Sequence, residues 1–279
     1  MTRRRELENH RRSLGEIRNI MNAMKNLSYM ETRKISSFLD VQHAVVKHIE
    51  TVAADFLSFY PDTLTVTTGT STDIYLLIGG ERGFCGDFNH ALLRHYKTIV
   101  LSSATVQPQL ISVGHKLTTL LETDEHKIIF IDGASVAEEV SKVLNQIIDQ
   151  LATLQQQYKS LNLYVLYHNN EQQIINQQLL PPFKTLLHQQ HEAHAPELNI
   201  PADEFLLDLN YHYLFAVLHE ILYTSLMAES RQRLTHLESA VKHMDEQSEE
   251  LHRKANVLRQ EEIIEEIEVI LLSSVHLDE

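Results

Sequence analysis

Residues 14–59 read LGEIRNIMNAMKNLSYMETRKISSFLDVQHAVVKHIETVAADFLSF and contain the repeat that decides the fold. Mostly apolar residues recur there in alternating steps of three and four, the spacing of one face of a helix. The positions are Leu14, Ile17, Met21, Met24, Ser28, Glu31, Ile35, Phe38, Gln42, Val45, Ile49, Val52, Phe56 and Phe59. Neither Gly nor Pro interrupts the stretch between Gly15 and Pro61. A helix of some fifty residues is about 80 Å long, so a small domain cannot bury all of it.

A second repeat lies near the other end of the chain. It consists of Leu234, Leu237, Val241, Met244, Ser248, Leu251, Ala255 and Leu258, and no Gly or Pro occurs from Asn210 to Glu279. Two long helices that each carry one apolar stripe bury those stripes most simply against each other. The sequence therefore predicts a long antiparallel coiled coil, formed by a helix within residues 1–60 and a helix within residues 203–279.

Between these helices, residues 73–185 have a different pattern. Short apolar runs alternate with helix-like stretches, which is typical of an α/β domain with a small, mostly parallel sheet. The expected strands are Asp73–Ile78, Gln109–Val113, Lys127–Ile131 and Asn162–Tyr167, and the expected helices are Phe88–Leu101 and Ser135–Tyr158. Residues 186–201 lack a period and are expected to form a loop.

Composition restricts the class of protein. With 43% hydrophobic residues, only 8 Gly and 6 Pro, the chain is expected to be ordered and rich in helix. A formal net charge of -14 argues against nucleic acid as the main partner, because phosphate binding depends on Lys and Arg. No apolar run approaches the roughly 20 residues that span a bilayer, so we expect the protein to work in the cytoplasm or on the cytoplasmic face of a membrane.

The string IGGERGFCGDFN, residues 78–89, directly follows a predicted strand and opens a helix. Taken alone, such a glycine-rich turn could hold a phosphate on its backbone N–H groups. It lacks the Gly-Lys-Ser/Thr of a P-loop, however, and no ribose-binding acid follows the next strand. A tight structural turn is the favoured interpretation, with its defining residues Gly79, Gly80, Gly83, Cys85 and Gly86.

Two further groups of residues invite a chemical interpretation. Cys85 could be a nucleophile on an exposed turn, but no base can be assigned to it, and a buried thiol is favoured. His188, His191 and His194 have a spacing that could hold a metal on a helix, yet Pro196 and the surrounding Gln residues favour a histidine-rich loop. The sequence thus predicts no catalytic residue, no metal site and no cofactor.

Three separated strings together resemble the gamma subunits of rotary F-type ATP synthases. The first string, Ile20–Leu27, is similar to the family's Ile-Thr-Lys-Ala-Met-Lys-Met-Val signature. The second is the glycine-rich string at residues 78–89, which is similar to the family's Ser-Asp-Arg-Gly-Leu-Cys-Gly-Gly-Leu/Phe-Asn motif. The third comprises Glu229, Arg233, Asn256, Arg259, Gln260, Ile263, Glu266 and Ile267. Several positions depart from the family pattern, among them Gly80-Glu81, Asp87, Met30-Glu31 and Ile264. With these departures the chain resembles a divergent member of the family, such as the gamma subunits of the alternate, sodium-type F-ATPases that some bacteria carry.

This resemblance implies a non-catalytic rotor shaft at the cytoplasmic face of the bacterial inner membrane. Its implied partners are the alpha and beta subunits of the catalytic hexamer, an epsilon subunit and the membrane ring of c subunits. The matched positions imply that Met24 and Lys25 on the first helix, with Arg259 and Gln260 on the last, contact the beta subunits. Two alternatives stay open from the sequence: a nucleotide- or small-ligand-binding α/β protein with a coiled-coil scaffold, and a coiled-coil scaffold with no rotary role.

Overall fold

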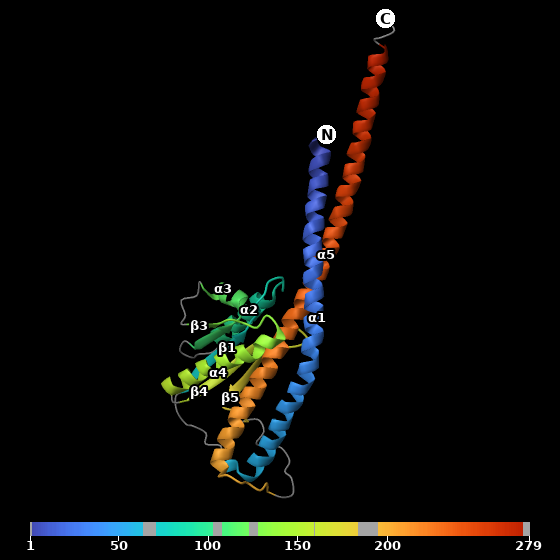
Figure 1. Ribbon diagram of the computed structural model, residues 1–279. Helices are drawn as coiled ribbons and strands as arrows, with labels where there is room; N and C mark the ends of the chain where they lie inside the picture. Colours follow the sequence, from blue (N-terminus) through green and yellow to red (C-terminus); the bar gives the residue numbers. More distant parts are fainter. Residues whose placement is uncertain are drawn as a thin grey trace. The chain divides into compact units, whose positions relative to one another are not determined.

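A computed structural model describes residues 2–63, 71–102, 108–122, 128–158, 160–183 and 195–275. The chain forms two compact units, and two helices take part in both. We call residues 1–28 with 234–279 the helical unit, and residues 29–233 the sheet unit. The shared helices are α1 (Thr2–Phe59) and α5 (Ala202–Val275) (Figure 1).

Helices α1 and α5 are antiparallel in each unit. In the helical unit Arg4 pairs with Glu262 across 3.0 Å, and Arg18 pairs with Asp245, so the partner's number falls as the number on α1 rises. The sheet unit continues this order, since the ring of Phe56 lies 4.8 Å from that of Phe205. The expectation of two long terminal helices beside an α/β domain is thereby confirmed.

Three of the fourteen predicted stripe positions on α1 are exposed, and at two of them the neighbouring residue is buried instead. Phe38 and Val45 are 42% exposed, and Ile17 is 46% exposed, whereas the neighbouring Leu39 and Val46 are buried. At residues 38–39 and 45–46 two adjacent residues are apolar, so either residue of each pair fits a stripe with steps of three and four. Packing against the sheet decides between them, because Leu39 and Val46 belong to the core that also contains the strands. On α5 the predicted seam residues Leu237 and Val241 are buried.

Within the described residues, the sheet has five strands in the order β3-β2-β1-β4-β5. Strands β1 (Thr72–Ile78), β2 (Gln109–Val113), β3 (Ile128–Ile131) and β4 (Leu161–His168) are parallel, as predicted. The sequence pattern did not predict β5 (Ile174–Leu180), which pairs antiparallel with β4. Its polar centre, residues 176–178, interrupts the apolar run by which the other strands are recognised.

Four further helical segments of at least three residues connect the strands in the described part of the sheet unit. Helix α2 (Phe88–Ser102) follows β1, the short α3 (His115–Leu121) follows β2, and α4 (Val140–Gln157) follows the turn η2 (Ala137–Glu139). Another turn, η1 (Pro61–Thr63), follows α1. The predicted loop at residues 186–201 lies mostly outside the described residues, and its described end, residues 195–201, is irregular up to the start of α5.

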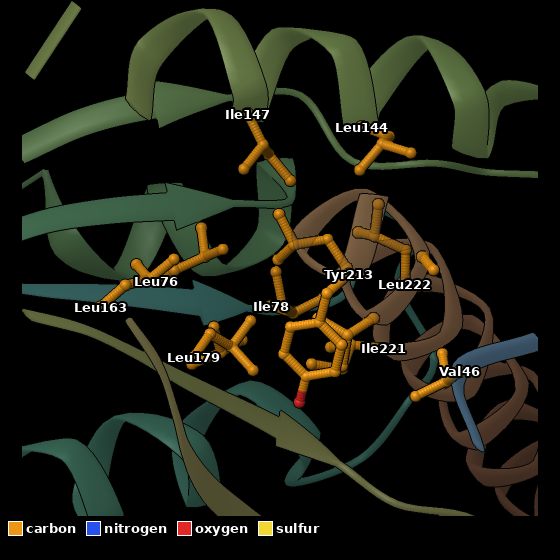
Figure 2. Packing of buried hydrophobic residues seen from close by; sticks show 14 of the residues in the cluster. Val46, Leu76, Ile78, Leu144, Ile147, Leu163, Leu179, Tyr213, Ile221 and Leu222 are labelled. Carbon is orange, nitrogen blue, oxygen red and sulfur yellow. The ribbon is translucent and has the colours of Figure 1, made fainter. Parts of the chain in front are cut away.

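Apolar side chains cover both faces of the sheet, which explains why its central strands are almost continuously apolar. Alternate residues point to opposite faces: Leu76 and Ile78 face α4, α1 and α5, whereas Tyr75 and Leu77 face α2 and α3. Figure 2 shows the first of these cores, where side chains from three strands meet Leu144, Ile221 and Val46. The helices α1 and α5 are therefore part of the domain's own core.

The phase of α1 can be tested with two neighbouring substitutions. We expect Val46→Asp to lower the free energy of unfolding by about 3 kcal/mol or more, because it buries an unpaired charge. Val45→Asp is the matched control and should change it by about 0.5 kcal/mol or less, since Val45 is exposed. Chemical denaturation of both variants would measure this difference, and equal effects would contradict the observed phase.

Candidate functional site

The glycine-rich turn lies at the place where doubly wound sheets usually bind ligands. It leaves the carboxyl end of β1, and the chain order changes direction there, because β2 and β4 lie on opposite sides of β1. In open α/β sheets this switch point forms the crevice for nucleotides and other small molecules. What occupies the crevice therefore decides between a ligand site and a structural joint.

Three polar residues of α5 point to the turn, one on each successive helical turn. They are Ser225, Glu229 and Arg233, which are spaced four residues apart and so share one helix face. Their exposed fractions are only 2%, 3% and 5%. We call these three residues the polar ladder of α5.

Each residue of the polar ladder hydrogen-bonds to backbone near the turn. The Ser225 hydroxyl donates to the carbonyl of Ile78 at 3.3 Å, at the very end of β1. The Arg233 guanidinium donates through Nε to the carbonyl of Gly83 at 3.1 Å. It also pairs with the Glu229 carboxyl group one helical turn away.

Glu229 accepts hydrogen bonds from the turn's own amides. Its Oε1 lies 3.1 Å from the backbone nitrogen of Arg82, and its Oε2 lies 3.4 Å from that of Glu81. A Cβ on Gly80 would lie 3.2 Å from the Glu229 Cδ, so glycine at this position lets the carboxyl group approach. Two of the N–H groups that could hold a phosphate, those of Glu81 and Arg82, thus already have an acceptor from the same chain.

A second carboxyl group joins the loops that follow β1, β2 and β3. The Glu81 Oε2 accepts from the backbone nitrogen of His115 at 2.8 Å and from that of Gly133 at 2.7 Å. Gly79 must be glycine here, because an added Cβ would lie 2.5 Å from the Cβ of Leu117. Gly114 has a φ of 108°, which also favours glycine.

The other predicted residues of the turn have different surroundings. Gly86 has a φ of 56°, in the left-handed region, whereas a Cβ on Gly83 would meet only the Lys116 Cε at 3.9 Å. Asn89, which opens α2, accepts from the backbone nitrogen of Gly80 at 2.8 Å through its side-chain oxygen. Sequence reasoning missed this contact and those of Ser225 and Glu81, because each depends on residues brought together by the fold.

Burial dominates the electrostatics of this joint. It raises the pKa of Glu229 above its ordinary value, while Arg233 and the amides of Arg82 and Glu81 act in the opposite direction. Burial, assisted by the neighbouring Glu229, raises the pKa of Cys85 to about 12. A thiol with this pKa carries almost no thiolate at neutral pH, so Cys85 lacks the reactivity of a nucleophile.

We therefore expect Cys85 to resist alkylation. It should remain unmodified by iodoacetamide at neutral pH in the folded chain, because only 5% of its surface is exposed and its thiol stays protonated. The chain unfolded in guanidinium is the control, in which the same thiol should react fully. Mass spectrometry would measure the label, and rapid modification of the folded chain would contradict the described burial.

Because amides of the turn already donate to Glu229, we expect ATP not to bind tightly to the isolated chain. Calorimetry of the isolated chain with ATP should give no stoichiometric micromolar binding, because the Glu229 carboxyl group already accepts from the turn. Stoichiometric binding at micromolar concentration would revive the nucleotide-binding alternative.

Comparison with known proteins finds relatives that match almost the whole chain. The family model described as ATP synthase matches residues 3–274. The chain belongs to the ATP synthase family. A relative in this family, the ATP synthase gamma chain of Mycoplasma mycoides subsp. mycoides, is 23% identical over 270 residues. The ATP synthase gamma chain of Clostridium botulinum strain Langeland is 22% identical over 271 residues, and each alignment covers 93% of both chains.

Solved structures of ATP synthases share the fold. A chain in the central stalk and c-ring structure of the Tetrahymena thermophila mitochondrial enzyme has a TM-score of 0.53 and 18% identity, and the match covers 79% of this chain and 99% of that one. A chain in the Euglena gracilis OSCP/F1/c-ring structure has a TM-score of 0.52 and 16% identity, with 94% and 95% covered. At this identity the likeness concerns the fold.

The residues that the ATP synthase family resemblance assigns to rotor contacts lie in the helical unit. Met24 and Lys25 are half-buried on α1, and the Met24 carbonyl accepts from the Ser28 hydroxyl at 3.0 Å. Arg259 and Gln260 on α5 are exposed. Within the described part of the chain, no hydrogen bond or ion pair involves Arg259.

These two pairs of residues lie at different levels of the antiparallel helices. Because Arg4 pairs with Glu262, Arg259 lies close to the first turns of α1. Lys25 is some twenty residues further along α1, which is about 30 Å at 1.5 Å per residue. The structure therefore places the two pairs of residues at separate levels of the helical unit.

Other predicted features of this ATP synthase family member concern ions and membranes. His188, His191 and His194 lie outside the described residues. Among the described residues, no group of three or more His, Cys, Asp or Glu could hold a metal ion. None of the described helices is both long enough and apolar enough to cross a membrane.

Proposed function

We infer that this chain is the gamma subunit of a rotary F-type ATP synthase. It forms the central rotor stalk, which couples ion flow through the membrane ring to ATP synthesis or hydrolysis at the alpha and beta subunits. The observation that carries this inference is the alignment with gamma chains over 93% of both lengths, together with the two terminal helices and the sheet. The subunit is not catalytic itself, since ATP is made and hydrolysed elsewhere in the complex.

The shaft acts on the catalytic sites by contact energy. An asymmetric shaft touches three otherwise equivalent sites differently, and it can favour the open or closed state of each site only through differential contacts. Changing one site from 1:99 to 99:1 requires about 5.5 kcal/mol of such a difference. The same linkage permits both directions: ion flow turns the shaft for synthesis, and hydrolysis turns it back.

The proposed arrangement assigns a partner to each part of the chain. The helices within residues 1–60 and 203–279 stand inside the hexamer of alpha and beta subunits. The domain at residues 73–185 rests, with an epsilon subunit, on the ring of c subunits. The solved structures named above are described as containing a central stalk, F1 and a c-ring, which supports this arrangement. The proposed location of the subunit is peripheral, at the cytoplasmic face of a bacterial inner membrane.

Arg259 and Gln260 are the proposed contacts of α5 with a beta subunit, and Met24 and Lys25 are those of α1. Arg259 is suited to this role because its guanidinium is exposed and can form a bidentate bond with a carboxylate. Such a bond can form at one rotor angle and break at another. Half-buried Met24 and Lys25 can both pack within the helix pair and present part of their surface to a partner.

The contact of α5 can be tested with Arg259→Ala combined with Gln260→Ala. We expect coupled ATP turnover of the assembled complex to fall, because part of the differential contact energy is lost. The isolated subunit should keep its stability within about 0.5 kcal/mol, since both side chains are exposed. ATP synthesis, ATP hydrolysis and ion transport are measured with the complex in vesicles.

A matched control removes two exposed basic side chains elsewhere on the same helix, with Arg253→Ala and Lys254→Ala. This control should retain more of the coupled turnover than the test variant. If the test complex assembled at normal yield and matched the parent in all three measurements, the assigned contact would be wrong.

A further inference from the structure

We propose that the polar ladder of α5 fixes the α/β domain on the rotor helix, and that Glu229 is its central positioning residue. This proposal rests on the proposed function, and it adds the place where torque passes between the domain and the shaft. The joint lies entirely within the sheet unit, between α5 and the turn at residues 79–86. Glu229 acts on ion coupling through the orientation of the domain and touches no reacting atom.

The ladder is suited to fix one register of the helix. Ser225 donates to the carbonyl of Ile78, just before the turn, and Arg233 donates to that of Gly83, whereas Glu229 accepts from the amides of the residues between them. These three residues extend over eight positions, which is about 12 Å of helix. Along α5 the ladder therefore presents a donor, an acceptor and a donor. This order pairs with the carbonyl and amide groups near the turn in only one register of the helix.

Apolar packing alone would resist sliding less well. The core that holds α5 on the sheet is made of aliphatic and aromatic side chains, and hydrophobic attraction has no preferred direction. A shift of α5 by one helical turn would exchange some apolar contacts for others. It would also place the buried Glu229 carboxyl group opposite a backbone carbonyl, of Ile78 or Gly83, which cannot donate a hydrogen bond to it.

Glu229 is central because its carboxyl group contacts both the amides of the turn and the next residue of the ladder. It accepts from the amides of Arg82 and Glu81, pairs with Arg233, and lies 3.7 Å from the Cys85 sulfur. Helix α5 continues without a break from Ala202 to Val275. Torque that reaches the domain is therefore passed through this joint to the same helix that enters the helical unit.

The test compares ion transport with ATP hydrolysis in the complete complex in vesicles. Glu229→Ala should retain ATP hydrolysis but reduce the number of ions transported per ATP several-fold, because the domain slips on α5. Acidification of the vesicle lumen and Na⁺ uptake are measured in parallel, so that either coupling ion is detected. Glu229→Gln is the conservative variant and should give an intermediate ratio, because its side-chain oxygen can still accept from one amide of the turn.

Two controls separate positioning from stability. Glu250→Ala removes a glutamate with the same four-residue spacing to a basic partner, Lys254, but on the exposed surface of α5, and it should leave the ratio unchanged. Leu77→Ala destabilises the opposite face of the sheet, away from the ladder. It should lower the melting temperature of the subunit and also leave the ratio unchanged.

The outcomes distinguish this proposal from the proposed function. A parent complex that transports no ions with ATP would refute the proposed function. A coupled parent together with a Glu229→Ala complex of the same ratio would overturn the joint, and so would an equal loss of ratio in Glu250→Ala or Leu77→Ala. If Glu229→Ala did not assemble, Ser225→Ala, which removes only the hydroxyl bonded to Ile78, should still lower the ratio, and an unchanged ratio would overturn the proposal.

Discussion

The burial of one apolar stripe on each terminal helix is the constraint from which the rest of this structure follows. A helix of this length is not stable alone in water through propensity, and its apolar face needs a partner. In the helical unit each helix is the other's partner. In the sheet unit the stripe of α1 meets the sheet and α5 together, so Val46, Leu76 and Ile221 share one core. The domain is thus built around the shaft helices, and it needs them to complete its own interior.

How much the sequence predicts depends on whether the deciding interaction is local. Four strands were predicted nearly to their ends, because burial on both faces makes each a short apolar run. The phase of α1 was predicted wrongly at Phe38 and Val45, since Val45 and Val46 are equally apolar and only the distant sheet distinguishes them. Strand β5 has one partner in the sheet and a polar centre, so it lacks the pattern of a buried strand.

The joint at the glycine turn shows the same division. The glycines and the absence of a P-loop could be read directly, and they favoured a structural turn. The acceptor for the turn's amides could not be predicted, because Glu229 is separated from them by almost 150 positions and only the fold brings them together. A signal was nevertheless present: Glu229 and Arg233 stand four residues apart within an apolar part of α5, where two charged residues are costly unless paired.

The Glu229 carboxyl group at the switch point also makes the joint independent of the concentration of small molecules. Related sheet architectures hold a diffusible molecule at this place, and the occupancy of such a site changes with the concentration of that molecule. Here the occupying group is covalently part of the same chain, so it cannot diffuse away, and its local concentration stays constant. The stiffness of this joint is therefore independent of the supply of nucleotide and phosphate. An ATP synthase, which acts on nucleotide and phosphate, thus contains a joint that these molecules do not regulate.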